Sequence, residues 1–182
     1  MKIPRCILVL LVALMPLVLR SADTALVASG LAYHKAGKAV TEMVIAKQVD
    51  LPAVTAQIDI LVKESVVMAE AYAKAYPKGR KLLDKVIASV PAMRAMSFDE
   101  LQTDWHDLGV FAKPGYETGI DLKDEDNEHF TDPIHAIVHP MLVLKAAQAY
   151  ATDKKEDNLK AMKEEMEEGL EQAEKLIAKL SR

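Results

Sequence analysis

The sequence predicts an all-α protein: an antiparallel four-helix-type bundle with a broken third helix and one long loop. Apolar residues recur at spacings of three and four along most of the chain, which is the period of an amphipathic helix. Aromatic residues make up only 5% of the chain, whereas Ala, Leu, Lys, Glu and Met abound, and this composition favours helices over strands. The connections between most of these segments are short, which is typical of antiparallel neighbours.

Residues 1–22 have the composition of a secretory signal peptide. Two basic residues precede an apolar run that ends before Arg20, and small residues follow. Because the run is shorter than the roughly 20 residues that cross a bilayer as a helix, we expect a cleaved signal rather than an anchor. Cleavage between residues 22 and 30 would leave residues 23–182 as a single domain without a stable membrane span. The expected location is outside the cytoplasm, either periplasmic or secreted.

The chain is acidic overall, with 23 basic and 27 acidic residues and a formal net charge of -4. Removing Lys2, Arg5 and Arg20 with the signal peptide leaves 20 basic residues and a net charge of about -7. Such a protein lacks the basic face that phosphate backbones require, so nucleic acid is not an expected partner. The only cysteine, Cys6, lies in the signal peptide, which excludes disulfides, thiolate metal sites and covalently attached haem from the mature chain.

The first two helices are predicted over residues 23–48 and 50–76. Gly30 and Gly37 lie seven residues apart on the apolar side of the first helix, where we expect them to allow close approach of a neighbouring helix. The second helix begins with Asp50 as its N-cap and a proline in its first turn, and it ends at a Pro-Lys-Gly turn.

The third helix begins near Leu82 and is expected to break at Pro91, because proline lacks the N–H that a helix interior requires. Ser97 and Glu100 have the spacing of a capping box, which would start the second part of this helix. Trp105 lies on the apolar side of that part and is interpreted as a core residue.

The helical periodicity disappears over residues 109–131, which include the acidic run 121–128. Loops of this length are uncommon in compact domains and are usually functional or disordered. The acidic run lacks the glycine and the glutamate that an EF-hand requires at fixed positions, so a solvated acidic loop is expected rather than a calcium site.

Two further helices complete the predicted bundle. Asp132 and Pro133 are expected to start a helix that runs to about Tyr150. Thr152 and Asp153 are expected to cap the last helix, which has one apolar side and one side rich in Glu and Lys.

Four histidines near the loop have metal-ligand chemistry: His106, His129, His135 and His139. A continuous helix would place His135 and His139, four residues apart, on one side, as two ligands of one zinc or copper ion require. His129 could fold back from the loop, and His106 could approach from the preceding helix. This geometry depends on Pro140: if the helix begins there, the two histidines need not share a face. In the alternative interpretation, these histidines lie at helix boundaries and bind no metal.

No set of residues specifies a reaction, because the serines lack a Gly-rich elbow and no pair of carboxylates is distinguished. A non-catalytic protein is therefore expected. The leading hypothesis is an exported protein that binds a partner protein or a small ligand through loop 109–131 and the adjoining helix ends. The alternative is a transition-metal-binding protein that uses His129, His135 and His139, with His106 as a further candidate ligand. Haem held between a histidine and a methionine has suitable residue types but no diagnostic spacing.

Overall fold

The computed structural model describes residues 6–181, with side chains described from residue 24 onward. This part of the chain consists of helices and connecting turns without strands, so the predicted all-α class is confirmed. Of the predicted signal peptide, residues 1–5 lie outside the described part, and so do the side chains of the remainder. No helix in the described part is long and apolar enough to cross a membrane.

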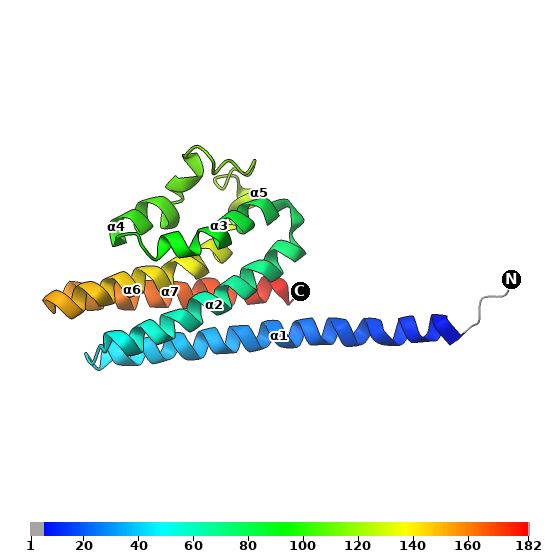
Figure 1. The fold of residues 1–182 in the computed structure, drawn as a ribbon, viewed down its shortest axis with the longest axis horizontal. Helices are drawn as coiled ribbons and strands as arrows, with labels where there is room; N and C mark the ends of the chain where they lie inside the picture. Colours follow the sequence, from blue (N-terminus) through cyan, green and yellow to red (C-terminus); the bar gives the residue numbers. More distant parts are fainter. Residues whose placement is uncertain (1–5, 182) are drawn as a thin grey trace.

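Four long helices lie side by side and enclose the main core (Figure 1). Each runs antiparallel to its neighbour, with α1 against α2 and α7, and α6 against α2 and α7. Their bounds are α1 Cys6–Ile45, α2 Leu51–Ala75, α6 Thr131–Asp153 and α7 Glu156–Leu180.

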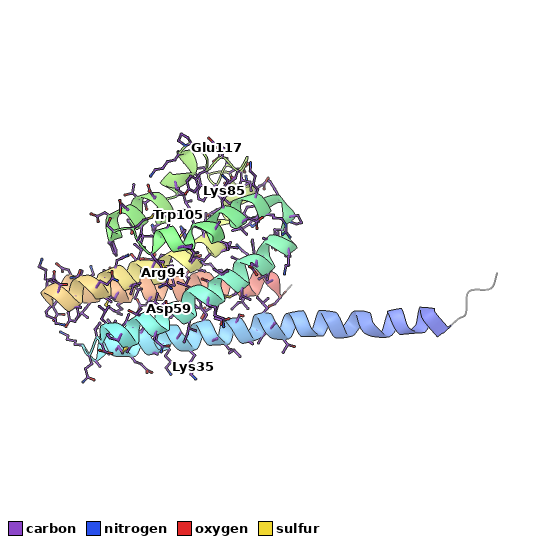
Figure 2. All side chains as sticks on the ribbon, viewed as in Figure 1. Lys35, Asp59, Lys85, Arg94, Trp105 and Glu117 are labelled. Carbon is purple, nitrogen blue, oxygen red and sulfur yellow. The ribbon has the colours of Figure 1, made fainter. Side chains whose placement is uncertain are left out.

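The segment between α2 and α6 forms a second layer over these two helices (Figure 1). Arg94, just after α3, forms an ion pair with Asp59 of α2, and Trp105, a residue of this layer, is fully buried (Figure 2). The predicted loop 109–131 contains regular structure, because residues 109–112 and 125–128 form short helices. In chain order the elements are η1 Pro77–Gly79, α3 Arg80–Met93, α4 Phe98–Leu101, the π-helical turn η2 Gln102–His106, η3 Gly109–Ala112 and α5 Glu125–Glu128.

Close contact between α1 and α7 occurs at Gly30 and Gly37, as predicted. A methyl group added at Gly30 would lie 2.4 Å from the Ile177 side chain, and one added at Gly37 would lie 2.8 Å from that of Leu170. Glycine at these two positions therefore lets the side chains of α7 reach the backbone of α1.

The predicted caps at two helix starts are confirmed. The Asp50 carboxylate accepts a hydrogen bond from the Ala53 backbone N–H at 3.0 Å, which satisfies an N–H in the first turn of α2. Ser97 and Glu100 form both bonds of a capping box at the start of α4.

The predicted break at Pro91 is wrong in position. Pro91 lies inside α3, which continues to Met93, and the chain leaves the helix between Met93 and Phe98. A proline in the last turn removes only one helical hydrogen bond, so the helix can continue for a few residues beyond it.

The starts predicted for the last two helices are also wrong. Asp132 is not an N-cap, because α6 already begins one residue earlier; its carboxylate instead forms an ion pair with Lys179 of α7. Thr152 and Asp153 end α6 rather than start α7. The Asp153 carboxylate accepts a hydrogen bond from the Lys155 backbone N–H at 3.0 Å, which supports the turn between the two helices.

Helix α6 runs without interruption through Pro140. The proline ring has no N–H to donate to the carbonyl of Ala136, four residues earlier. Tyr33, a fully buried residue of α1, donates its hydroxyl to this carbonyl at 3.0 Å. The hydroxyl replaces the missing backbone bond, so the helix continues and His135 and His139 lie on consecutive turns of it.

Candidate metal centre

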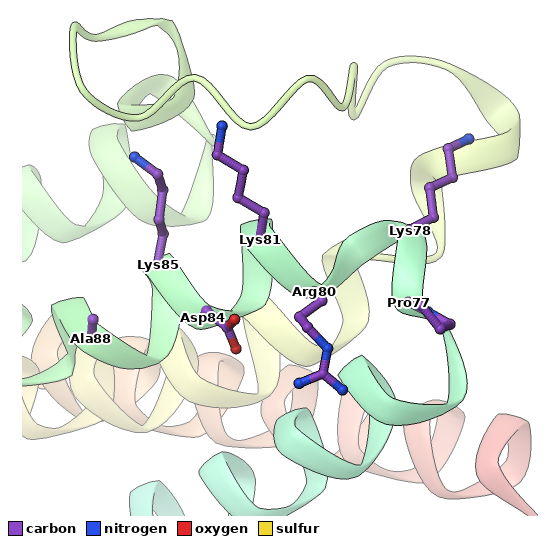
Figure 3. A pocket seen from close by; sticks show the side chains of 7 residues that line it. All are labelled: Pro77, Lys78, Arg80, Lys81, Asp84, Lys85 and Ala88. Carbon is purple, nitrogen blue, oxygen red and sulfur yellow. The ribbon is translucent and has the colours of Figure 1, made fainter.

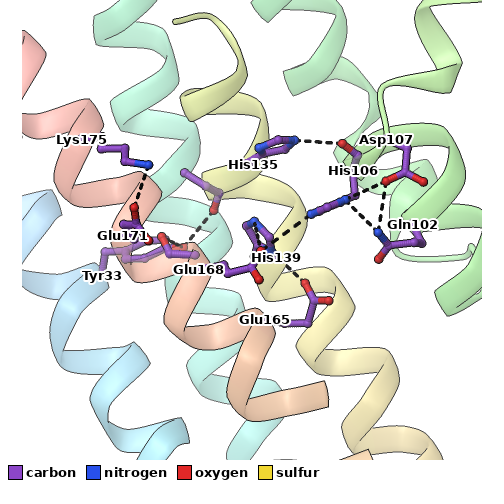
Figure 4. Close-up of polar contacts among 12 residues, drawn as sticks. Tyr33, Gln102, His106, Asp107, His135, His139, Glu165, Glu168, Glu171 and Lys175 are labelled. Atoms are coloured by element: carbon purple, nitrogen blue, oxygen red, sulfur yellow. Dashed lines mark hydrogen bonds and ion pairs between the residues drawn. The ribbon is translucent and has the colours of Figure 1, made fainter. Parts of the chain in front are cut away.

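Three potential metal ligands from three elements converge beside the second layer (Figure 4). His106 ends the turn η2, His139 lies in the middle of α6, and Glu168 projects from α7. The His139 side chain is only 1% exposed, that of His106 is 25% exposed, and that of Glu168 is 56% exposed. The group therefore has a buried side at His139 and a solvent side at Glu168.

The spacing of the three donor atoms suits a metal ion. Glu168 Oε2 lies 3.9 Å from His106 Nε2 and 3.8 Å from His139 Nε2, which is too far for a hydrogen bond. No two donors of the group are more than 4.8 Å apart. An ion equidistant from such a triangle would lie about 2.1–2.5 Å from each atom, against the roughly 2.0–2.2 Å of zinc–nitrogen and zinc–carboxylate bonds. In a tetrahedral site with such bonds the ligand atoms lie about 3.4 Å apart, so the two carboxylate–imidazole distances would each have to shorten by about half an ångström.

Each of the two imidazoles has a second carboxylate at its other nitrogen. Glu165 Oε2 lies 2.8 Å from His139 Nδ1, and Asp107 Oδ1 lies 3.0 Å from His106 Nδ1. A carboxylate at Nδ1 favours the proton there, which leaves the Nε2 lone pair directed at Glu168. At His106 the side-chain nitrogen of Gln102 also lies 2.8 Å from Nδ1, so this tautomer requires that Gln102 give its N–H to Asp107 instead. Metal-binding histidines in proteins are oriented in the same way, by a carboxylate or carbonyl on the nitrogen that does not bind the ion.

The Asp107 carboxylate is itself supported by Gln102, whose side-chain nitrogen donates to it at 3.2 Å. The hydrogen bond with His106 is the main cause that holds the pKa of Asp107 below its usual value, and the bond from Gln102 adds to it. Asp107 is therefore ionised near neutral pH, and it competes for His106 Nδ1 with the Gln102 side-chain nitrogen, which lies 2.8 Å from the same atom.

His135 supports the turn that carries His106. Its Nε2–H donates to the backbone carbonyl of His106 at 3.0 Å, and the two rings are stacked with their centroids 5.0 Å apart. Burial lowers the pKa of His135 to about 4, so the ring is neutral at physiological pH. This residue holds His106 in place, while its own Nε2 is directed away from the donor group.

A glycine in α7 allows the two glutamates to reach the centre. A methyl group added at Gly169 would lie 3.0 Å from the Cβ of His139 and 3.1 Å from the hydroxyl of Tyr33. Both distances are tighter than ordinary van der Waals contacts. The absence of a side chain at Gly169 therefore lets α7 pack closely enough to present Glu165 and Glu168 to the histidines.

The structure brings together three of the four histidines that the sequence singles out, and it places His129 elsewhere. His129 Nδ1 lies 2.7 Å from the Tyr72 hydroxyl, and its ring packs at 5.1 Å from that of Tyr76. Burial is the main cause that lowers the pKa of His129. The fifth histidine, His34, pairs with Glu174 on the surface between α1 and α7.

The glutamates of the centre were not among the predicted ligands. Glu165 and Glu168 lie on the charged side of α7, a helix with acidic residues at most exposed positions. No sequence spacing relates them to histidines more than twenty residues away, so only the packing of α7 on α6 distinguishes them from their neighbours.

A separate hollow of about 560 Å³ lies along η1 and α3, and no histidine lines it (Figure 3). Lys78, Lys81 and Lys85 point towards the loop that contains Gly115, and Arg80 points in the opposite direction. The Lys85 ammonium donates to the carbonyl of Gly115 in that loop. The lining residues are Pro77, Lys78, Arg80, Lys81, Asp84, Lys85 and Ala88.

Comparison of the chain with protein families, with curated proteins and with solved structures finds no match. The function is therefore inferred from the side chains of the centre.

Proposed function

We propose that this protein binds a divalent transition-metal ion, with His106, His139 and Glu168 as ligands and zinc as the best-suited ion. The observation that carries the proposal is the arrangement of two imidazole Nε2 atoms around one carboxylate, with a further carboxylate behind each ring. Two imidazoles and one carboxylate form a common ligand set for zinc in proteins.

The electrostatics of the centre without an ion also favour a cation. When both protons lie on Nδ1, next to Glu165 and Asp107, the two histidines present lone pairs to the Glu168 carboxylate, and three acceptors then face one another without a donor. Such a cluster gains by taking up a proton or a metal ion.

The proposal is tested with metal-free protein titrated with zinc. We expect one equivalent to bind and the unfolding midpoint to rise by about 5–10 °C when zinc is about 100-fold above its Kd, which corresponds to about 2.7 kcal/mol. The measurements are isothermal calorimetry, elemental analysis and thermal unfolding. The variant His34→Ala, which removes the surface His34–Glu174 pair, should bind zinc as the unmodified protein does. Absence of stoichiometric binding of both zinc and copper would refute the proposal.

A second candidate function is the binding of a small anion in the hollow on α3. Four cationic side chains and one carboxylate line this hollow, although the chain as a whole is acidic. This local excess of positive charge lies beside the loop 109–131, for which the sequence suggests a ligand-binding role.

The anion-binding candidate is tested by calorimetric titration with pyrophosphate. We expect binding by the unmodified protein and its loss in Lys81→Glu, because Lys81 is exposed in the middle of the hollow. Lys63→Glu on α2 is the control: it makes the same charge change outside the hollow and should leave binding intact. Equal loss in both variants, or no binding by the unmodified protein, would exclude a specific anion site.

A further inference from the structure

We propose that the metal ion in this centre keeps one coordination position open to solvent, where a small monodentate anion such as azide or a carboxylate binds. This inference rests on the proposed function, because it concerns the ion held by His106, His139 and Glu168.

The protein offers three donors, and they approach the ion from a limited set of directions. His139 lies on the buried side, His106 approaches from η2, and Glu168 approaches from α7 (Figure 4). Zinc usually takes four ligands, and three-ligand sites in proteins leave the fourth position to water or a substrate. Since Glu168 is more than half exposed, the side of the centre next to it is accessible to solvent.

His135 is the further imidazole that borders the centre, so it is the obvious competitor for the fourth position. Its ring centroid lies 5.0 Å from that of His106 and 5.6 Å from that of His139. Its Nε2–H donates to the His106 carbonyl, which leaves Nδ1 as its only lone pair, and His135 does not belong to the group of residues whose donor atoms all lie within 4.8 Å of one another. Turning His135 towards the ion would break this bond and the stacking on His106, and would loosen the turn that presents a ligand. His135 is therefore a positioning residue rather than a ligand.

The charge of the coordination sphere favours an anion at the open position. Two neutral imidazoles and one carboxylate leave a single positive charge on a divalent ion. Asp107 and Glu165 are also acidic, but they lie behind the imidazole rings, so their charges act over a longer distance than that of Glu168. A small anion can thus displace the bound water and neutralise the sphere.

The experiment uses Co²⁺ as a spectroscopic substitute for zinc and azide as the probe, with the visible absorption of the bound ion as the readout. The unmodified protein and His135→Ala are each loaded with Co²⁺ and titrated with azide. We expect a saturable change in the cobalt bands of both proteins once they are loaded, with weaker Co²⁺ binding by His135→Ala because His106 loses a support. If His135→Ala does not fold, His135→Asn, which keeps an N–H donor, takes its place.

The outcomes separate this inference from the proposed function. No cobalt spectrum in the unmodified protein, together with no zinc binding, would refute metal binding itself. A normal cobalt spectrum that azide leaves unchanged in both proteins would refute the open position while metal binding stands. A response to azide only in His135→Ala would show that His135 is the fourth ligand, which also overturns the inference.

Discussion

Replacing His139 with alanine is expected to lower the zinc affinity by at least about 100-fold. His139 is the buried ligand, and its loss removes a coordination bond together with the support that Glu165 gives to the ring. Loss of a supporting carboxylate alone typically lowers metal affinity by about 10–100-fold, so loss of the ligand should cost at least as much. The affinity is measured by competition with a chromophoric chelator.

A surface ligand gives the same test without disturbing the core. Glu168→Ala should also lower the zinc affinity strongly. Because the side chain is 56% exposed, its removal leaves no cavity, so a loss of affinity reports the lost ligand and not a damaged core. Glu167→Ala is the matched control, because the neighbouring Glu167 is 57% exposed and belongs to the same helix, where it pairs with Lys163. Equal zinc affinities of these two variants would mean that Glu168 is not a ligand.

His129→Ala distinguishes the ligands expected from sequence from those that the structure brings together. Since His129 packs against Tyr72 and Tyr76, its replacement should leave the zinc affinity unchanged. A loss as large as that of His139→Ala would place His129 in the centre and contradict the proposed ligand set.

The histidines of the centre could be proposed from sequence, because a spacing of four residues places His135 and His139 on the same side of a continuous helix. Whether that helix continues through Pro140 could not be predicted. The carbonyl that Pro140 leaves unpaired accepts a hydrogen bond from the hydroxyl of Tyr33, which lies more than a hundred residues earlier in the chain. Glu168 could not be predicted either, because its sequence context is the same as that of the other acidic residues of α7.

The same contrast applies to the fold. The period of the apolar residues is a local property and was sufficient to predict an all-α protein, while the local cap signatures at Asp50 and Ser97 were sufficient to predict two helix starts. Asp132 has the sequence context of a helix cap as well, yet its carboxylate pairs with Lys179 from the far end of α7. A local pattern contains no information about such tertiary contacts, which override local propensity.

Tyr33→Phe is expected to destabilise the protein by about 1–3 kcal/mol, which is the usual cost of leaving a buried polar group unpaired. The variant keeps the ring in the core but leaves the carbonyl of Ala136 without a donor. Burial raises the pKa of Tyr33 far above its usual value, so the hydroxyl keeps its proton and remains a donor at any physiological pH. Urea unfolding measures the change, and Tyr150→Phe, at the partly exposed end of α6, is the control.

A double-mutant cycle with Pro140 tests the reason for this destabilisation. Pro140→Ala restores an N–H that can donate to the carbonyl of Ala136 through the ordinary helical bond. In that background the carbonyl no longer depends on Tyr33, so Tyr33→Phe should cost less than it does when Pro140 is present. The difference between the two costs of Tyr33→Phe measures the coupling between the hydroxyl and the proline. The cavity that alanine leaves at position 140 cancels, because it is present with and without the Tyr33 hydroxyl. An equal cost in both backgrounds would mean that Tyr33 stabilises the fold through its other contacts, among them the Gly169 carbonyl at 3.3 Å, and not by completing α6.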